Sequence, residues 1–233
     1  MLAIDVSTSM LAEDLKPNRL EAAKDVAAEF INGRPNDNIG ITLFAGETFT
    51  QCPLTVDHAV LLDMIHNIKC GLITDGTAVG MGIANAVTRL KDSKAKSKVI
   101  ILLTDGTNNK GDISPMTAAE IAKSFGIRVY TIGVGTNGMA PYPYPVGNTV
   151  QYVSMPVEID EKTLTEIAGT TDGNYFRATS NSKLKEVYEE IDKLEKTKLN
   201  VKEYSKRDEE YHWFALAAFL CVLLEVLLRN SVL

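Results

Sequence analysis

Asp5, Ser7 and Ser9 stand at every second position directly after the apolar residues that open the chain. One carboxylate and two hydroxyls offer oxygen ligands, which a small hard cation such as Mg²⁺ prefers. Because the apolar run Leu2–Val6 predicts a strand, these side chains would lie in the loop at its carboxyl end. The spacing therefore predicts part of a metal site, whose remaining ligands must come from elsewhere in the chain.

Two further segments carry oxygen ligands at comparable positions. Thr77 opens a predicted helix, and Asp105 directly follows the apolar run Lys98–Thr104. The predicted ligand set is therefore Asp5, Ser7, Ser9, Thr77 and Asp105. Mg²⁺ takes six oxygens, so a set with only two carboxylates leaves room for an Asp or Glu of a partner protein. We interpret Asp75 as the cap of the helix that Thr77 opens. The alternative is that Asp75 lies behind the ligands and supports them without binding the metal.

Strands alternate with helices along most of the chain. The apolar patterns predict strands at 2–6, 38–44, 48–50, 98–104, 128–132 and 174–178, and helices at 19–32, 57–68, 76–90, 114–125, 160–168 and 181–199. This alternation is typical of an α/β fold with a doubly wound, mostly parallel sheet. Ligands of such folds bind beyond the carboxyl ends of the strands, where all three metal-binding loops are expected.

Gly133–Gly138 matches the pattern G-x-G-x-x-G of dinucleotide-binding loops. That loop must open a helix, whereas Pro141, Pro143 and Pro145 follow here and exclude one. We interpret the segment as an exposed loop near the site, either part of a recognition surface or only a connection.

The ordered set D-x-S-x-S, a helix-opening Thr and a strand-end T-D-G resembles the metal-ion-dependent adhesion site of von Willebrand factor type A domains. The likeness covers residues 1–198. Thr104–Pro115, Ile127–Gly135 and Ala140–Pro143 resemble the BatA group of bacterial aerotolerance proteins. The resemblance implies that Asp5, Ser7, Ser9, Thr77 and Asp105 bind Mg²⁺, with Mn²⁺ as a substitute, and that Asp5 or Asp105 acts through water.

The same resemblance implies a function. Such proteins are membrane-anchored, metal-dependent protein-interaction modules and not enzymes. Their implied partners are MoxR-type AAA+ ATPases and other membrane proteins of this domain type, in stress or oxygen tolerance.

The C-terminal region predicts a membrane anchor. Residues 211–228 would reach about 27 Å as a helix, against a bilayer core of roughly 30 Å, and Glu225 is its one charged residue. The predicted organisation is a domain at 1–198, a charged linker at 199–210 and a transmembrane helix at 211–228 in the bacterial inner membrane. Basic residues before the helix favour a cytoplasmic domain. Family members carry membrane helices before the first strand, so we expect an N-terminal segment to be missing. Such a segment would reverse the orientation of the domain that the basic residues favour.

Composition narrows the other possibilities. A formal net charge of −6 disfavours a nucleic-acid partner. The three cysteines form no C-x-x-C pair, which argues against a thiolate zinc site, while a Cys52–Cys70 disulfide stays open. Two alternatives to an interaction module are a haloacid-dehalogenase-like phosphatase and an inert membrane scaffold. The phosphatase requires an acid two residues after its nucleophilic Asp, where Ser7 cannot act as a general acid.

Overall fold

A computed structural model describes residues 1–136, 138–146, 149–204 and 216. The chain divides into two compact units, Met1–Leu194 and Glu195–Leu233. The first unit contains the sheet and all of the predicted metal ligands. The described part of the second unit consists of the end of helix α6 (Asn181–Tyr204) and Leu216, which is helical.

A six-stranded sheet forms the centre of the first unit, in the order β3-β2-β1-β4-β5-β8. Its strands are β1 (Leu2–Asp5), β2 (Ile39–Phe44), β3 (Thr48–Thr55), β4 (Val99–Thr104), β5 (Arg128–Val134) and β8 (Tyr175–Ala178). Every neighbouring pair is parallel except β2 and β3. The predicted α/β class and mostly parallel sheet are confirmed.

The central strands β1 and β4 are buried almost throughout, which explains their unbroken apolar sequences. They are adjacent and parallel, with Ile4 opposite Leu103. The residues that follow the two strands therefore emerge side by side at the same edge of the sheet. This edge is where Asp5 and Asp105 lie.

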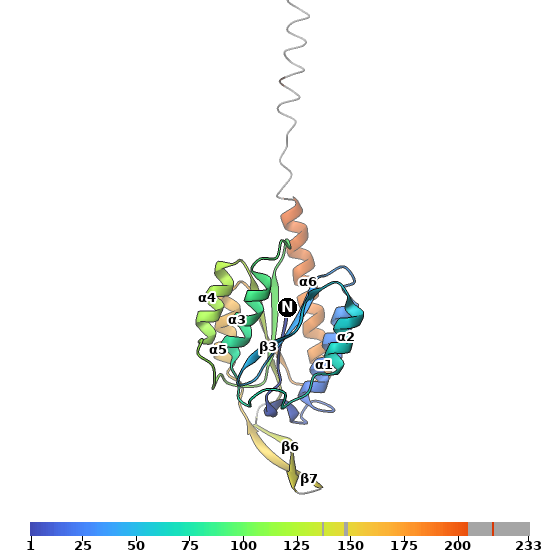
Figure 1. The fold of residues 1–233 in the computed structure, drawn as a ribbon, viewed down its shortest axis with the longest axis vertical. Coiled ribbons are helices and arrows are strands. Elements are labelled where there is room, and N and C mark those ends of the chain that lie inside the picture. The colour runs from blue at the N-terminus through green and yellow to red at the C-terminus, as the bar shows by residue number, and fades with distance from the viewer. Residues whose placement is uncertain (137, 147–148, 205–215, 217–233) are drawn as a thin grey trace, which may run out of the picture. The chain divides into compact units, whose positions relative to one another are not determined.

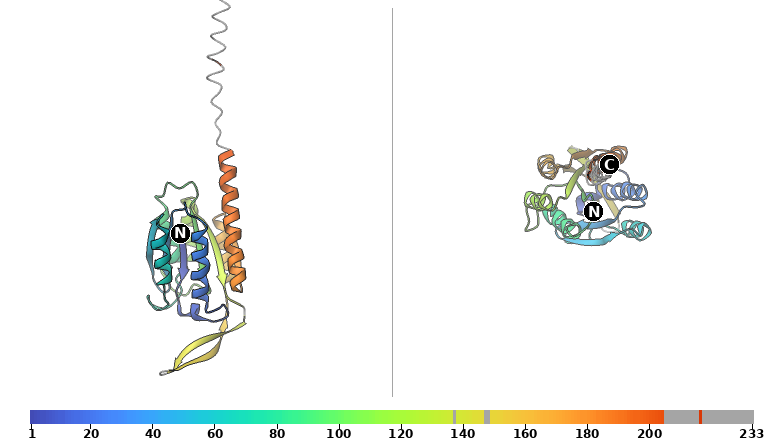
Figure 2. Two further views of the ribbon diagram at one scale, coloured as in Figure 1. Left: turned by 90° about the vertical axis from the view of Figure 1, so that its right-hand side faces the viewer. Right: turned by 90° about the horizontal axis from the view of Figure 1, so that it is seen from above.

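Helices cover both faces of the sheet, as Figures 1 and 2 show. The helices before α6 are the short 3-10 helix η1 (Thr8–Leu11), α1 (Arg19–Asn32), α2 (His58–His66), α3 (Val79–Leu90), α4 (Pro115–Ser124) and α5 (Glu161–Thr170). Apolar residues of α1, α2 and the first turns of α6 pack with Leu2 and Ile4 on one face. Those of α3, α4 and α5 pack with Ala3 and Leu102 on the other. The sheet is thus buried on both sides.

Residues 138–157 form a two-stranded antiparallel sheet, and the prediction of a loop over 133–145 is wrong. β6 (Gly138–Val146) pairs along its whole length with β7 (Thr149–Val157). Figures 1 and 2 show this hairpin projecting beyond the edge of the main sheet where β1 and β4 end. The prolines occupy only alternate positions, so the residues between them keep the N–H groups that the pairing needs. Because β6 follows β5, no helix follows the G-x-G-x-x-G pattern.

Three element ends differ from the prediction by three residues or more. β3 continues to Thr55 through Pro53, which is tolerated because β3 is an edge strand with irregular register. Helix α3 begins at Val79 and not at Gly76, whose φ of +127° does not fit a helix. Helix α6 runs to Tyr204 and therefore enters the predicted linker.

The predicted transmembrane helix at 211–228 lies outside the described residues, apart from Leu216. Within the described part of the chain, no helix has both the length and the apolar character required to cross a membrane.

Candidate metal centre

Two strand ends supply the carboxylates of the candidate centre. Asp5 ends β1 with 0% exposure, and Asp105 follows β4 with 2% exposure. The Oδ1 of Asp5 accepts a hydrogen bond from the Ser7 amide at 2.9 Å, and its Oδ2 accepts one from the Thr104 hydroxyl at 2.6 Å. These two bonds fix the carboxylate between β1 and β4 and fold the following loop back towards it.

The two serine hydroxyls connect this loop to Asp105. The Oγ atoms of Ser7 and Ser9 lie 2.9 Å apart, and Ser9 donates to the Oδ1 of Asp105 at 2.8 Å. Ser7 is buried whereas Ser9 is exposed. A continuous group of side-chain oxygens therefore joins Ser7, Ser9 and Asp105, and the Ser7 amide links this group to Asp5. Four of the five predicted ligands thus lie together between the end of the sheet and the surface.

Thr77, the fifth predicted ligand, is held at this group by its backbone. Its amide donates to Asn109 Oδ1 at 2.9 Å, and its carbonyl accepts from the Asn109 amide at 3.0 Å. Its Oγ1 would lie 3.4 Å from a Cβ added to Gly106, next to Asp105. Among the described residues, this hydroxyl has no hydrogen-bond partner. It is therefore free to act as a ligand.

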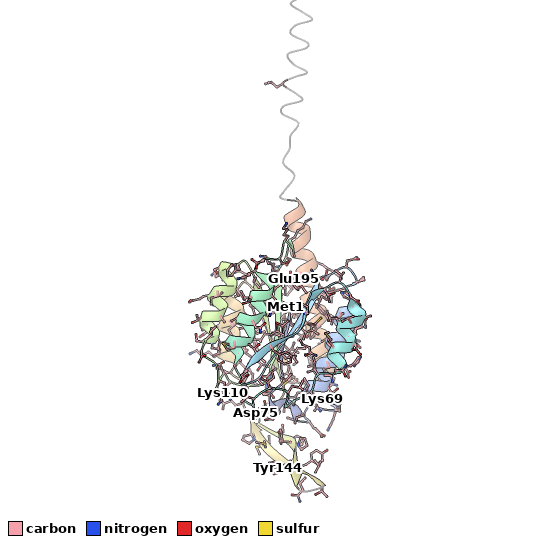
Figure 3. The ribbon with its side chains drawn as sticks, viewed as in Figure 1. Met1, Lys69, Asp75, Lys110, Tyr144 and Glu195 are labelled. Atoms are coloured by element: carbon pink, nitrogen blue, oxygen red, sulfur yellow. The ribbon has the colours of Figure 1, made fainter. Side chains whose placement is uncertain are left out.

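A cleft of about 350 Å³ opens over this group. One wall consists of the predicted ligands Ser9, Thr77 and Asp105 with the loop that follows Asp105, and the other belongs to the β6–β7 hairpin. Figure 3 shows Asp75 and Lys110 at the edge of the domain and Tyr144 on the projecting hairpin. The arrangement leaves the oxygen ligands accessible to a protein segment from outside.

The interpretation of Asp75 as a helix cap is wrong. Helix α3 begins after Ala78 and has no side-chain cap. The Asp75 carboxylate instead accepts from the amide and the hydroxyl of Thr8, at 3.0 and 2.8 Å. Burial acts to raise the pKa of Asp75, but the hydrogen bonds from Thr8 outweigh it and keep the pKa below its usual value. Asp75 thus anchors the loop between Ser7 and Ser9, which matches the alternative of a position behind the ligands.

Sequence reasoning missed a buried arginine behind Asp105. Arg19, at the start of α1, is 1% exposed and donates through Nη1 to the Oδ2 of Asp105 at 2.6 Å. Its Nε and Nη2 donate to the two oxygens of Asp14 at 2.7 and 2.6 Å. The one available signal was a cation in the first turn of a helix, where the helix dipole disfavours positive charge.

Burial makes both carboxylates of the centre difficult to ionise. Burial first, and the charge of Asp105 second, raise the pKa of Asp5 to about 7. Burial also raises the pKa of Asp105, although Arg19 opposes this. Burial also acts to raise the pKa of Asp14, but the hydrogen bonds from Arg19 and Thr136 outweigh it. The pKa of Asp14 is therefore lowered. Asp5 and Asp105 are thus costly to keep charged without a further cation.

The chemistry of the ligands fits a hard divalent cation. All five are oxygens, as Mg²⁺ and Mn²⁺ prefer. The described residues contain no group of three or more His, Cys, Asp and Glu side chains that could hold a metal, so the hydroxyls are required.

Cys70 lies close to the candidate centre, since its Sγ donates to the Ser7 carbonyl at 3.4 Å. Burial raises the pKa of this thiol to about 12. Cys52 and Cys70 are free, and the open question of their disulfide is thereby answered.

Comparison with known proteins identifies the family. The model of the von Willebrand factor type A domain matches residues 1–190. The chain belongs to this family. The VWA fold is a metal-dependent protein-interaction fold, and the match covers every residue of the candidate centre.

Curated bacterial proteins are similar to this VWA domain. A UPF0353 protein of Mycolicibacterium paratuberculosis is 32% identical over 202 residues, covering 81% of this chain and 57% of the relative. The chain spans 57% to 66% of the length of the first two curated relatives that it matches.

Two similar solved structures come from a narrower group within the VWA family. An aerotolerance-related membrane protein from Bacteroides fragilis is 34% identical, with a TM-score of 0.71, and covers 83% of this chain and 98% of its own. BatB from Bacteroides thetaiotaomicron is also 34% identical, with a TM-score of 0.73, over 84% of this chain and 97% of its own. The predicted likeness to bacterial aerotolerance VWA proteins is confirmed.

A more distant VWA structure carries a metal. Proximal thread matrix protein 1 of the mussel byssus has a zinc-occupied metal-ion-dependent adhesion site. It is 25% identical, with a TM-score of 0.64, and covers 83% of this chain and 44% of its own. Divalent metal binding therefore occurs in a structural relative of this domain.

Proposed function

We propose that this VWA domain binds a protein partner through a divalent cation held by Asp5, Ser7, Ser9, Thr77 and Asp105. The observation that carries the proposal is the connected group of oxygens Ser7–Ser9–Asp105, which opens into the cleft beside the free hydroxyl of Thr77. The cation, Mg²⁺ by preference and Mn²⁺ as a substitute, would attract a carboxylate of the partner. A module with this task is a binding protein and not an enzyme.

The protein's own residues prepare the centre in two ways. Thr104 and the Ser7 amide hold Asp5, while Arg19 and Ser9 hold Asp105, so neither carboxylate is free to turn away. The hairpin and the loop after Asp105 enclose the ligands from two sides. Partial enclosure lowers the local dielectric constant and strengthens attraction for an acidic side chain.

We further propose that the domain acts at the bacterial inner membrane, anchored by residues 211–228. The description of the Bacteroides fragilis relative as an aerotolerance-related membrane protein supports this, as does the apolar sequence of those residues. A MoxR-type AAA+ ATPase and other VWA membrane proteins are the proposed partners, in stress or oxygen tolerance.

The first test measures metal binding by the chain in the absence of a partner protein. The full chain, purified in a mild detergent, is titrated with Mg²⁺ by calorimetry as wild type and as Asp105→Ala. We expect binding to the wild type and its loss in the variant. The variant should keep its circular dichroism spectrum, because Arg19 retains both bonds to Asp14. Equal Mg²⁺ binding by both proteins would refute the ligand assignment.

The second test uses the immobilised full chain and a purified MoxR-type AAA+ ATPase. Capture in Mg²⁺ that is lost in chelator, and lost in Asp105→Ala, would support a metal-bridged complex. Capture of the same amount with and without metal would contradict it and favour the scaffold alternative.

A further inference from the structure

The outer edge of strand β6 is closed to further pairing. The carbonyl of Pro141 accepts a hydrogen bond from the Glu13 amide, outside the hairpin, at 2.9 Å. In an antiparallel strand the N–H and C=O of a residue point the same way, and alternate residues share that direction. Pro143 and Pro145 therefore also face outward, where they offer no N–H. The three prolines block this edge without interrupting the pairing with β7.

The outer edge of strand β7 is open. The residues opposite the three prolines are Ser154, Tyr152 and Val150. Residues opposite each other in an antiparallel pair have the same hydrogen-bonding state, so the N–H and C=O groups of these three also point outward. In the part of the chain that the structure describes, none of these backbone groups has a hydrogen-bond partner. Together with the carbonyl of Pro156, they form a free row of donors and acceptors.

Apart from Pro156 at the end nearest the cleft, this edge also lacks the usual protection against pairing. Proteins commonly shield exposed edge strands with charged residues, prolines or covering segments. Residues 138–157 contain no Asp, Glu, Lys, Arg or His. The β7 side chains Val150, Tyr152, Val153 and Met155 are 58%, 62%, 46% and 45% exposed. An uncharged, apolar and unpaired edge is suited to receive another strand.

We propose that the outer edge of β7 binds an extended segment of the partner protein as a third strand of the hairpin. This proposal rests on the metal-dependent binding proposed above and specifies its partner. Met155, Pro156, Val157 and Glu158 line the cleft at the metal centre, so a strand along β7 leads into that cleft. The segment has apolar side chains at alternate positions, to match the hairpin, and an Asp or Glu at the end nearest the cation.

A second copy of this chain is a poorer occupant. The hairpin of a second copy contains no carboxylate. If two β7 strands paired antiparallel about Ser154, Glu158 of each copy would lie opposite Val150 of the other, at the end away from the cleft. The acid would therefore be missing where the cation requires it. A different chain, with an acid at the end of its strand, meets both requirements.

The test uses a defined set of probes. Nine-residue peptides alternate Val with Thr and carry one Glu, which is moved through all nine positions; a matched set carries Gln instead. Binding to the full chain in detergent is measured by fluorescence anisotropy, in Mg²⁺ and in chelator. Ser154→Pro removes one outward N–H and spares the pairing with β6. Its control, Ser154→Ala, keeps the N–H and removes only the hydroxyl.

We expect the tightest binding from peptides with Glu near one end. Ser154→Ala should bind them like wild type, and Ser154→Pro roughly tenfold or more weakly, through the lost hydrogen bond and the added ring. Amide exchange at Val150, Tyr152 and Ser154 should slow when peptide binds. Equal affinity of both variants, or no peptide binding by the wild type, would overturn the proposal.

The two proposals fail in different ways. If Gln peptides and chelator weaken binding while Ser154→Pro does not, the metal bridge stands and the added strand is wrong. If Ser154→Pro weakens binding while Gln and chelator have no effect, the added strand stands and the metal bridge is wrong. Dimerisation that Ser154→Pro abolishes and peptides do not displace would assign the edge to a second copy instead.

Discussion

Arg19 and Asp105 form an ion pair of 2.6 Å beneath the cleft, with side chains 1% and 0% exposed. Because Ser9 donates to the other oxygen of the same carboxylate, Asp105 is held from the interior by α1 and from the surface by the first loop. The direction in which Asp105 presents its oxygens therefore depends on a residue that sequence reasoning did not include in the centre.

Replacing Gly135 tests this dependence. A Cβ at Gly135 would lie 2.6 to 2.9 Å from three atoms of the Arg19 side chain. We expect Gly135→Ala to displace Arg19 and to weaken Mg²⁺ binding. The control is Gly126→Ala, because Gly126 also has a positive φ but no atom near the added Cβ. Both variants carry backbone strain of about 1–3 kcal/mol, and Gly135→Ala should lose roughly 1–3 kcal/mol more. Urea unfolding measures the loss of stability, and calorimetry measures the Mg²⁺ affinity. An unchanged Mg²⁺ affinity in Gly135→Ala would show that metal binding does not depend on the position of Arg19.

Thr77→Val removes the free hydroxyl at nearly constant volume. Since that hydroxyl has no partner among the described residues, the free energy of unfolding in chelator should change little. Mg²⁺ affinity should fall by about tenfold, the value of one polar contact to a charged group. Thr42→Val is the matched control, because the buried Thr42 hydroxyl also has no partner but belongs to β2, outside the centre. A Thr77→Val variant that binds Mg²⁺ like Thr42→Val would remove Thr77 from the ligand set.

Asp75→Ala should loosen the first loop. The variant loses both bonds to Thr8, which lies between two of the proposed ligands. Asp57→Ala is a useful comparison, since Asp57 makes one side-chain bond to the Val60 amide at the start of α2, away from the centre. Each substitution should cost about 1 kcal/mol in unfolding experiments. Only Asp75→Ala should weaken Mg²⁺ binding, and equal Mg²⁺ affinities in the two variants would show that the loop needs no such anchor.

The raised pKa of Asp5 predicts a pH dependence. The carboxyl ionises near 3.8 in the unfolded chain and at about 7 in the folded one. In chelator, Asp5 therefore contributes full stability below pH 4, and this contribution is lost as the pH rises to about 7. Mg²⁺ requires the ionised form, so its stabilising effect should increase over the same interval.

The comparison is made with Asp5→Asn, because other groups titrate in this range. Asp105, whose pKa burial also raises, is one of them. The difference in unfolding free energy between wild type and Asp5→Asn in chelator should decrease from pH 4 to pH 7. A difference that is constant with pH would contradict the raised pKa.

The sequence was sufficient wherever its signals were local. Unbroken apolar runs identified β1 and β4, and parallel pairing then required their following residues to meet, so that Asp5, Ser7, Ser9 and Asp105 were brought together as predicted. The hairpin was missed because the alternate prolines were used only to exclude a helix, and the segment was then interpreted as a loop. Prolines at alternate positions are compatible with a strand when they face outward. That orientation depends on the register with β7.

The residues behind the ligands could not be predicted for a different reason. Asp75 and Thr8 are 67 positions apart, and Arg19 and Asp105 are 86 apart. Polar contacts of this kind leave no periodic pattern, because each depends on how three loops meet. An Asp before a helix has an ordinary local explanation as a helix cap, and this was chosen for Asp75, whereas Arg19 was given no role.

The bonds of Arg19 to two carboxylates leave the side chains beneath the cleft with an uneven set of charges. Asp5, Asp14 and Asp105 supply three negative charges when ionised, and Arg19 supplies one positive charge. A dication brings this buried set to neutrality, whereas Na⁺ or K⁺ leaves one charge uncompensated and a trivalent ion adds one. Uncompensated charge is expensive in a protein interior. Discrimination among cations at this position would therefore begin with valence, before ionic radius or ligand geometry has any influence.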